Sequence, residues 1–189
     1  KTLPLFCFFA SGFSGLLFEV LWTRQLSQHL GNSAFSVSAV LTVFMAGIGG
    51  GALLGGHLAD RLATSRQRFL AYGICEAAAA LLALGVPLML QGLHPMLSQA
   101  YSHFEGSFFA FHLVSLLAAA LALLPSTIAM GAGLPLLTRM LVQEEGAVSW
   151  YAGLLYGLNT FGAALGAWAS GFILIPHLGL TNTMLIGMV

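Results

Sequence analysis

The sequence predicts an all-α polytopic membrane protein with six transmembrane helices, arranged as two inverted three-helix repeats in a single membrane domain over residues 1–189. Three observations predict it: 58% of the residues are hydrophobic, 6% are charged, and the second half repeats the pattern of the first. A soluble domain usually carries about 25% charged residues. So few charges cannot cover a water-facing surface, which makes the lipid bilayer the expected partner. The formal net charge of zero gives no reason to expect nucleic acid.

The first expected repeat covers about residues 1–92 and contains three spans. A helix needs about 20 predominantly apolar residues to cross a bilayer. Runs that meet this length extend over about Leu3 to Leu30, Ala34 to Leu58 and Phe69 to Leu90. We expect the third to end near Pro87, because proline lacks the backbone N–H that a helix interior uses.

The second expected repeat covers about residues 107–189. Its first span lies within Phe108 to Val142, which is long for one helix, and its two prolines are expected to kink it. Its second span covers about Val148 to Ile175, and its last begins near Leu180. Because the ten residues that remain are too few to cross a bilayer, we expect the polypeptide to continue beyond Val189.

The basic residues predict the orientation, since Lys and Arg concentrate on the cytoplasmic side of membrane proteins. Five of the six fall at the chain start, between the second and third spans, or at the end of the fourth: Lys1, Arg61, Arg66, Arg68 and Arg139. If these are cytoplasmic, only Arg24 is outside. We therefore expect a bacterial inner-membrane protein with its N-terminus in the cytoplasm.

Sliding the chain against itself by 115 residues gives a gapless internal match. Eleven identities fall within positions 11–58, among them Thr23-Arg24, which meets Thr138-Arg139. Because the repeat contains three spans, the fourth span crosses in the direction opposite to the first. Inverted repeats of this kind are common in secondary transporters. Arg24 and Arg139 then lie at opposite membrane interfaces, where a long side chain can reach the headgroups.

Glycines four positions apart recur in the second and fifth spans. This spacing forms a groove that a neighbouring helix can approach closely. We expect the following glycines to pack helices together, or alternatively to form a sliding interface: Gly47, Gly51, Gly55, Gly153, Gly157, Gly162 and Gly166.

Two acidic residues lie inside spans, where a charge costs about 2.5–3.5 kcal/mol on insertion scales. Glu19 and Arg24 are five residues apart and face different directions on a helix, so Glu19 needs a partner on another helix, a cation or a proton. Glu76 either pairs with Arg139 or Arg61 or belongs to a cation site. The candidate substrate, cation or proton site comprises Glu19, Trp22, Tyr72, Glu76 and Asn159, the last of which is expected to hydrogen-bond across helices.

The segment GGHLADRLATSRQR, residues 55–68, resembles the loop motif of the major facilitator superfamily. That resemblance implies half of a major facilitator fold, in which Asp60 pairs with a neighbouring helix end and helices shift only when this contact breaks. Ala63 and Thr64 stand where a second glycine is usual. A simpler role, in which the basic residues only fix the topology, remains open. The residues that carry the resemblance are Gly56, Leu58, Asp60, Arg61, Arg66 and Arg68.

Residues 11–61 resemble the membrane domain of bacterial spermidine synthase-like proteins fused to a major-facilitator-like part. Glu19, Trp22 and Arg24 follow in the order found in the first span of that family, and the glycine-rich second span ends in Leu-Ala-Asp-Arg. The resemblance implies a domain that anchors the protein and transports or senses a cationic, polyamine-type substrate. Aminopropyltransferase activity would need the soluble domain that commonly follows in the family and that residues 1–189 do not contain.

The sequence contains no nucleophile elbow, no phosphate-binding loop outside the spans and no HExxH motif. We expect no metal and no cofactor. Two other functions stay open: an accessory subunit of a larger membrane complex that transports nothing itself, and a proton-coupled secondary transporter. Because half a transporter encloses no pathway alone, a homodimer or another membrane subunit is the expected partner.

Overall fold

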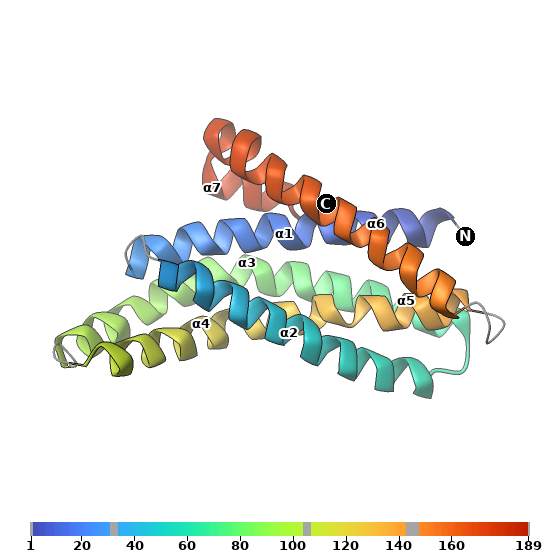
Figure 1. The fold of residues 1–189 in the computed structure, drawn as a ribbon, viewed down its shortest axis with the longest axis horizontal. Helices are drawn as coiled ribbons and strands as arrows, with labels where there is room; N and C mark the ends of the chain where they lie inside the picture. Colours follow the sequence, from blue (N-terminus) through green and yellow to red (C-terminus); the bar gives the residue numbers. More distant parts are fainter. Residues whose placement is uncertain (1, 31–33, 104–106, 143–147, 189) are drawn as a thin grey trace.

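The computed structural model describes residues 2–30, 34–103, 107–142 and 148–188, which are almost entirely helical. Figure 1 shows an elongated bundle in which α1 (Thr2–Leu30), α2 (Ala34–Arg61) and α3 (Ser65–His103) alternate in direction along the long axis. Within the described residues, five helical segments are long and apolar enough to cross a membrane. The predicted all-α, membrane-protein class is therefore confirmed at this level.

The fourth crossing consists of α4 (Phe108–Gly131) and α5 (Gly133–Leu141), which meet at a break at Ala132. Pro135 explains the break, because it has no N–H to donate to the carbonyl four residues earlier. Pro125 lies inside α4 without interrupting it. The crossing runs opposite to α1 (Figure 1), as an inverted repeat requires.

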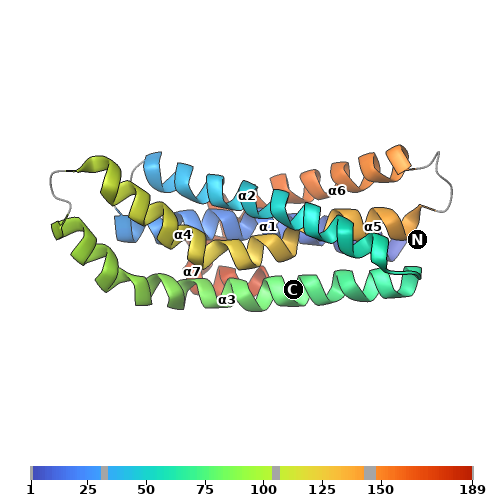
Figure 2. The ribbon, with the colours of Figure 1, turned by 90° about the horizontal axis from the view of Figure 1, so that it is seen from below.

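The prediction of six crossing helices is wrong for the described chain, which has five. Helix α6 (Val148–Ala169) continues through a π-helical turn (Ser170–Leu174) into α7 (Ile175–Ile186), and the chain reverses at Gly179, where φ is 77°. The residues after this reversal run back toward the middle of the bundle (Figures 1 and 2). Nine residues, 180–188, rise about 14 Å as a helix, less than half of the roughly 30 Å of a hydrocarbon core.

Two helices run further than predicted. Helix α3 continues through Pro87 and Pro95 to His103, and the helix after α6 continues through Pro176. Each proline removes one backbone hydrogen bond, but lipid cannot solvate an open backbone as water does, so ending the helix there would leave more groups unpaired. Proline in this bundle therefore lies within helices, and α3 curves toward α4 in its later part (Figure 2).

The most extensive helix contacts are α1 with α6 and α2 with α4. With the 115-residue offset, α1 corresponds to the α4–α5 crossing and α2 corresponds to α6. The α1–α6 contact is therefore the equivalent of the α2–α4 contact. The glycine contacts follow the same rule. A Cβ added to Gly51 would strike the backbone of Ile128, and one added to Gly166 would strike the backbone of Phe13, which is the position equivalent to Ile128.

Five of the seven predicted packing glycines lie at close helix contacts. Besides Gly51 and Gly166, these are Gly47 against Thr127, Gly55 against Ala132 and Gly162 against Phe9. The prediction is wrong for Gly153 and Gly157, which have open space where a Cβ would lie and which face outward. They occupy the first turns of α6, on a side where no described helix lies against it.

Two clusters of buried apolar side chains fill the bundle. The larger joins α1, α2, α3 and α4 around Trp22, whose ring stacks on Phe18 and tilts against Phe44. The smaller joins α1, α2, α3, α5 and α6 around Tyr72 and Leu137. Many other large apolar side chains point outward, as expected of helices that face lipid.

One end of the bundle holds the N-terminus, the connection from α2 to α3 and the end of α5 (Figure 1). Arg61, Arg66, Arg68 and Arg139 therefore share this end, as the predicted topology requires. Arg24 is exposed near the opposite end of α1. Which side of the membrane each end faces stays a prediction.

Candidate functional site

The five residues of the predicted substrate, cation or proton site do not form one site. Glu76 and Tyr72 line a pocket between α1 and α3. Asn159 lines a second pocket, between α1, α2 and α6. Glu19 and Trp22 lie further along α1 and line neither pocket.

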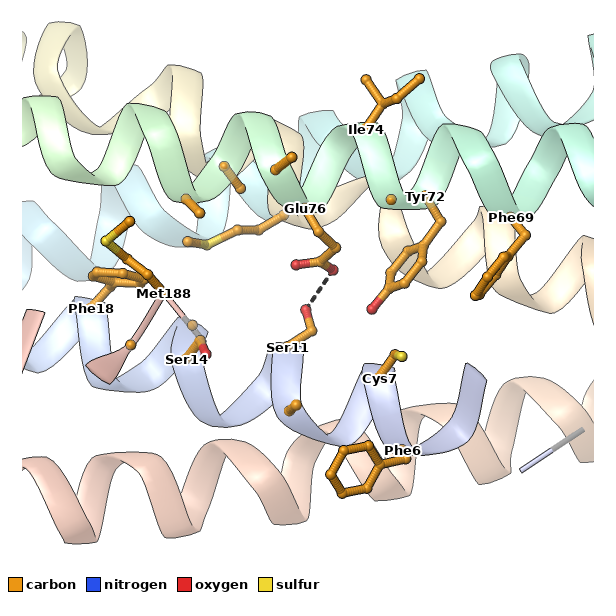
Figure 3. Close-up of a pocket in the computed structure, with 18 of the residues that line it drawn as sticks. Phe6, Cys7, Ser11, Ser14, Phe18, Phe69, Tyr72, Ile74, Glu76 and Met188 are labelled. Carbon is orange, nitrogen blue, oxygen red and sulfur yellow. Dashed lines mark hydrogen bonds between the residues drawn. The ribbon is translucent and has the colours of Figure 1, made fainter. Parts of the chain in front are cut away.

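The α1–α3 pocket has a volume of about 620 Å³ and largely apolar walls. Figure 3 shows the Glu76 carboxylate extending from α3 toward α1, where Ser11 Oγ donates a hydrogen bond of 2.7 Å to Glu76 Oε1. The Tyr72 hydroxyl points toward the same carboxylate (Figure 3). A carboxylate, three hydroxyls (Ser11, Ser14 and Tyr72) and several aromatic rings therefore line one cavity, the rings being those of Phe6, Phe18, Phe69 and Tyr72.

Of the two alternatives left open for Glu76, the ion pair with Arg139 or Arg61 is not found among the described residues. Arg139 Nη2 lies 2.7 Å from Asp60 Oδ1 instead, and Arg61 is exposed. Across the described ranges no Lys or Arg forms an ion pair with Glu76. An ionised carboxylate with only hydroxyl partners in an apolar wall is costly, and binding either a proton or a cation would offset that cost.

Ser11 was not among the predicted site residues. A signal for it existed, because Ser11 and Ser126 are identical across the repeat. Both hydroxyls bond to α3: Ser11 to the carboxylate of Glu76, and Ser126 to the main-chain oxygen of Ala79 at 2.9 Å. The two serines therefore mark contacts of α1 and of α4 with α3, and only the contact of α1 involves an ionisable group.

The second pocket, of about 440 Å³, is lined by residues of α1, α2, α6 and the α4–α5 crossing. Asn159 Nδ2 donates to the main-chain oxygen of Phe8 at 3.1 Å, which confirms the predicted hydrogen bond across helices. Thr160 and Tyr156 add hydroxyl groups to the lining. No acidic or basic side chain lines this pocket. It therefore lacks the negative charge that Glu76 would provide to a cation in the α1–α3 pocket.

Glu19, Trp22 and Gln25 form a strip along α1 and share an unusual property. Glu19 Oε2, Trp22 Nε1 and Gln25 Oε1 are all buried and have no hydrogen-bond partner among the described residues. An unpaired buried donor or acceptor costs about 1–3 kcal/mol. Thr23 Oγ1 donates to the main-chain oxygen of Glu19 at 2.8 Å, so it does not donate a hydrogen bond to the Glu19 carboxylate. Arg24 is exposed and, in the part of the chain described, forms no ion pair with Glu19.

At the end near the N-terminus, the predicted loop motif ties three helices together. Asp60 at the end of α2 pairs with Arg139 on α5, so the expected contact with a neighbouring helix end is present. Arg68 donates to the main-chain oxygens of Ala59, Leu62 and Arg139. One guanidinium therefore holds the ends of α2 and α5 against the start of α3. Of the other motif residues, Arg61 and Arg66 are exposed, and Gly56 has open space where a Cβ would lie.

Comparison with known proteins finds no relative: the chain matches no family model, and no curated protein or solved structure is significantly similar to it. In the described ranges, no group of three or more His, Cys, Asp or Glu side chains is placed to hold a metal ion. A function can therefore be proposed only from the geometry of the pockets and the loop motif together with the sequence patterns.

Proposed function

We propose that this chain is a membrane domain of the secondary-transporter type that binds a polyamine-type cation in the α1–α3 pocket. The observation that carries the proposal is the Glu76 carboxylate, which has hydroxyl neighbours and, among the described residues, no basic partner. The cavity, at about 620 Å³, lies within the range of about 300–1,000 Å³ typical of small-molecule sites. A carboxylate beside aromatic rings attracts organic cations by charge and by cation–π contact.

The packing of the helices supports the transporter type. The contacts of α1 with α6 and of α2 with α4 are equivalents under the repeat, and α1 and the α4–α5 crossing run in opposite directions. Transporters with inverted repeats use such pseudo-symmetry to alternate between two states.

The loop motif supplies a contact that would have to open when the helices move. Asp60, Arg139 and Arg68 join three helix ends at one face of the bundle. Both charged side chains of the ion pair are more than half exposed, at 59% for Asp60 and 57% for Arg139, so the pair can open at little cost. We propose that this contact is the gate, and that it faces the cytoplasm of a bacterial inner membrane.

The choice of a polyamine-type cation rests on the resemblance of residues 11–61 to spermidine synthase-like membrane domains, and homodimer formation is proposed with it. Binding of spermidine to the purified protein in lipid nanodiscs tests the proposal. Glu76→Gln removes the charge but keeps an acceptor for Ser11, and it should weaken binding at least tenfold, or about 1.4 kcal/mol. Glu19→Gln is the matched control and should bind as the wild type does. Equal affinity of the Glu76→Gln variant, or no binding by the wild type, would contradict the proposal.

A further inference from the structure

Three unpaired polar atoms lie on one strip of α1, away from both pockets. Glu19, Trp22 and Gln25 follow at intervals of three residues, so each lies about 4.5 Å further along the helix and about 60° round it. Trp22 is fully buried, and its indole N–H has no acceptor in the described chain. Along the axis of α1, the strip starts at Gln25, about 7.5 Å from the Leu30 end of the helix. It ends at Glu19, about 9 Å further into the bundle.

The packing of the fold does not require polar groups at these positions. The equivalent residues of the second repeat, 115 positions later, are Leu134, Leu137 and Met140. Leu137 is fully buried, and the other two pack against the same apolar cluster. The same architecture therefore fills this strip with apolar side chains in one repeat and with polar atoms in the other, so the polar atoms have a cause other than packing.

We propose that Glu19, Trp22 and Gln25 line an internal track of water molecules that leads from the Arg24 end of the bundle to Glu19, where a proton is taken up. Water donates to the two unpaired oxygens and accepts from the indole N–H, and a buried water typically makes about three such bonds. In the uptake step a hydronium ion of the track gives its proton to the carboxylate. An O–H bond forms on Glu19, an O–H bond of hydronium breaks, and a water molecule stays in the track.

The other ionisable groups near the strip are few. On α1 itself there are Arg24, which is exposed, and His29, whose side chain lies outside the described residues. Helix α2 has none before His57, and α4 contributes His112, whose ring packs edge-on against Phe35. On α7, His177 is exposed, and on α6 the tyrosines lie only in the first turns. The side chains of the α3 histidines near the Arg24 end of the bundle are outside the described residues. Among the described residues Glu19 is therefore the carboxylate available to protons in this half of the bundle.

Infrared difference spectroscopy of the protein in nanodiscs tests the proposal, because a protonated carboxyl group has a distinct C=O band that shifts in D₂O. On acidification the wild type should show a band that is absent from Glu19→Gln, and this band should shift within the mixing time after transfer to D₂O. A Glu19 band that shifts only over hours would place the carboxyl in a dry core and overturn the proposal. The absence of any Glu19 band at every pH at which the protein stays folded would also overturn it.

Variants of the strip distinguish a track of water molecules from an isolated Glu19 carboxyl group. Trp22→Phe and Gln25→Leu each remove one partner of water, and each should slow the D₂O shift at least tenfold, as expected for the loss of a hydrogen bond of about 1.4 kcal/mol. Unchanged rates in both would contradict the track. Glu76→Gln, in the α1–α3 pocket, should leave the Glu19 band and its rate unaltered, so this test is independent of polyamine binding.

A further variant copies the second repeat by combining Glu19→Leu with Gln25→Met. It should elute as a folded protein on size exclusion and show no carboxyl band from the strip. If it fails to fold, the polar strip is required for structure, and the proposal is overturned.

Discussion

Replacing Gly51 by alanine should destabilise the bundle, whereas the same change at Gly50, one residue away, should not. At Gly51 the new Cβ would meet backbone atoms of Ile128 and Gly131, while at Gly50 nothing lies within 4 Å. A backbone cannot turn aside as a flexible side chain does. Helices α2 and α4 must therefore separate, and the contacts along their interface weaken.

The magnitude follows from two opposing effects. Alanine is favoured over glycine inside a helix by up to about 1 kcal/mol, and Gly50→Ala should show that gain alone. Overpacking a close interface costs about 1–3 kcal/mol, and Gly51→Ala should show the gain and the cost together. The two variants should therefore differ by about 1–3 kcal/mol, or roughly 5- to 150-fold in the unfolding equilibrium.

Reversible unfolding in mixed micelles, followed by circular dichroism, measures this difference. The repeat provides an independent copy of the experiment on α1 and α6, with Gly166→Ala as the crowded site and Gly157→Ala as the open one. Equal stabilities within each pair, to about 0.5 kcal/mol, would refute the symmetric packing of the two helix pairs.

Two other predictions concern contacts between helices. Asp60→Asn should lower the stability by no more than about 1 kcal/mol, because the pair with Arg139 is exposed, but it should speed amide hydrogen exchange at the adjoining helix ends. Combining Asp60→Arg with Arg139→Asp should restore slow exchange, and an unaffected single variant would contradict the gate. Asn159→Leu should cost about 0.6 kcal/mol, the mean for hydrogen bonds between membrane helices, and greater stability than the wild type in the same unfolding assay would contradict this.

Hydropathy predicted where the spans begin because every crossing must contain a long apolar run. It failed at the later end of α3, which continues through Pro87 although that proline was expected to end the span, and after α6, where the helix continues past the predicted end at Ile175. That rule describes helices whose open ends are solvated by water, and in an apolar environment continuing the helix satisfies more backbone groups. Glycine spacing identified the contacts of Gly51 and Gly166, but it could not exclude Gly153, because spacing does not say which helix face meets a neighbour.

The candidate site was predictable in part. Glu76 could be found because an acid inside an apolar run is costly to bury. Its partner could not, since Ser11 lies 65 positions away and reaches Glu76 only through the relative rotation of α1 and α3. The alternative ion pair of Glu76 with Arg139 does not form for the same reason. Arg139 lies at the end of α5, where it pairs with Asp60 at the end of α2. Contacts between residues far apart in the chain depend on how the helices pack, and the pattern of a single sequence does not predict that packing.

The central claim is that α1 and its equivalent in the second repeat, the α4–α5 crossing, pass through the membrane in opposite directions. Site-directed cysteine labelling in intact cells tests it most directly, with an impermeant thiol reagent and with both native cysteines replaced by serine. The account predicts that Arg66→Cys and Ser149→Cys react only after the membrane is opened, whereas Gln28→Cys and Ser107→Cys react from outside; all four side chains are exposed. Labelling of Arg66→Cys and Ser149→Cys from opposite sides of the membrane would contradict it.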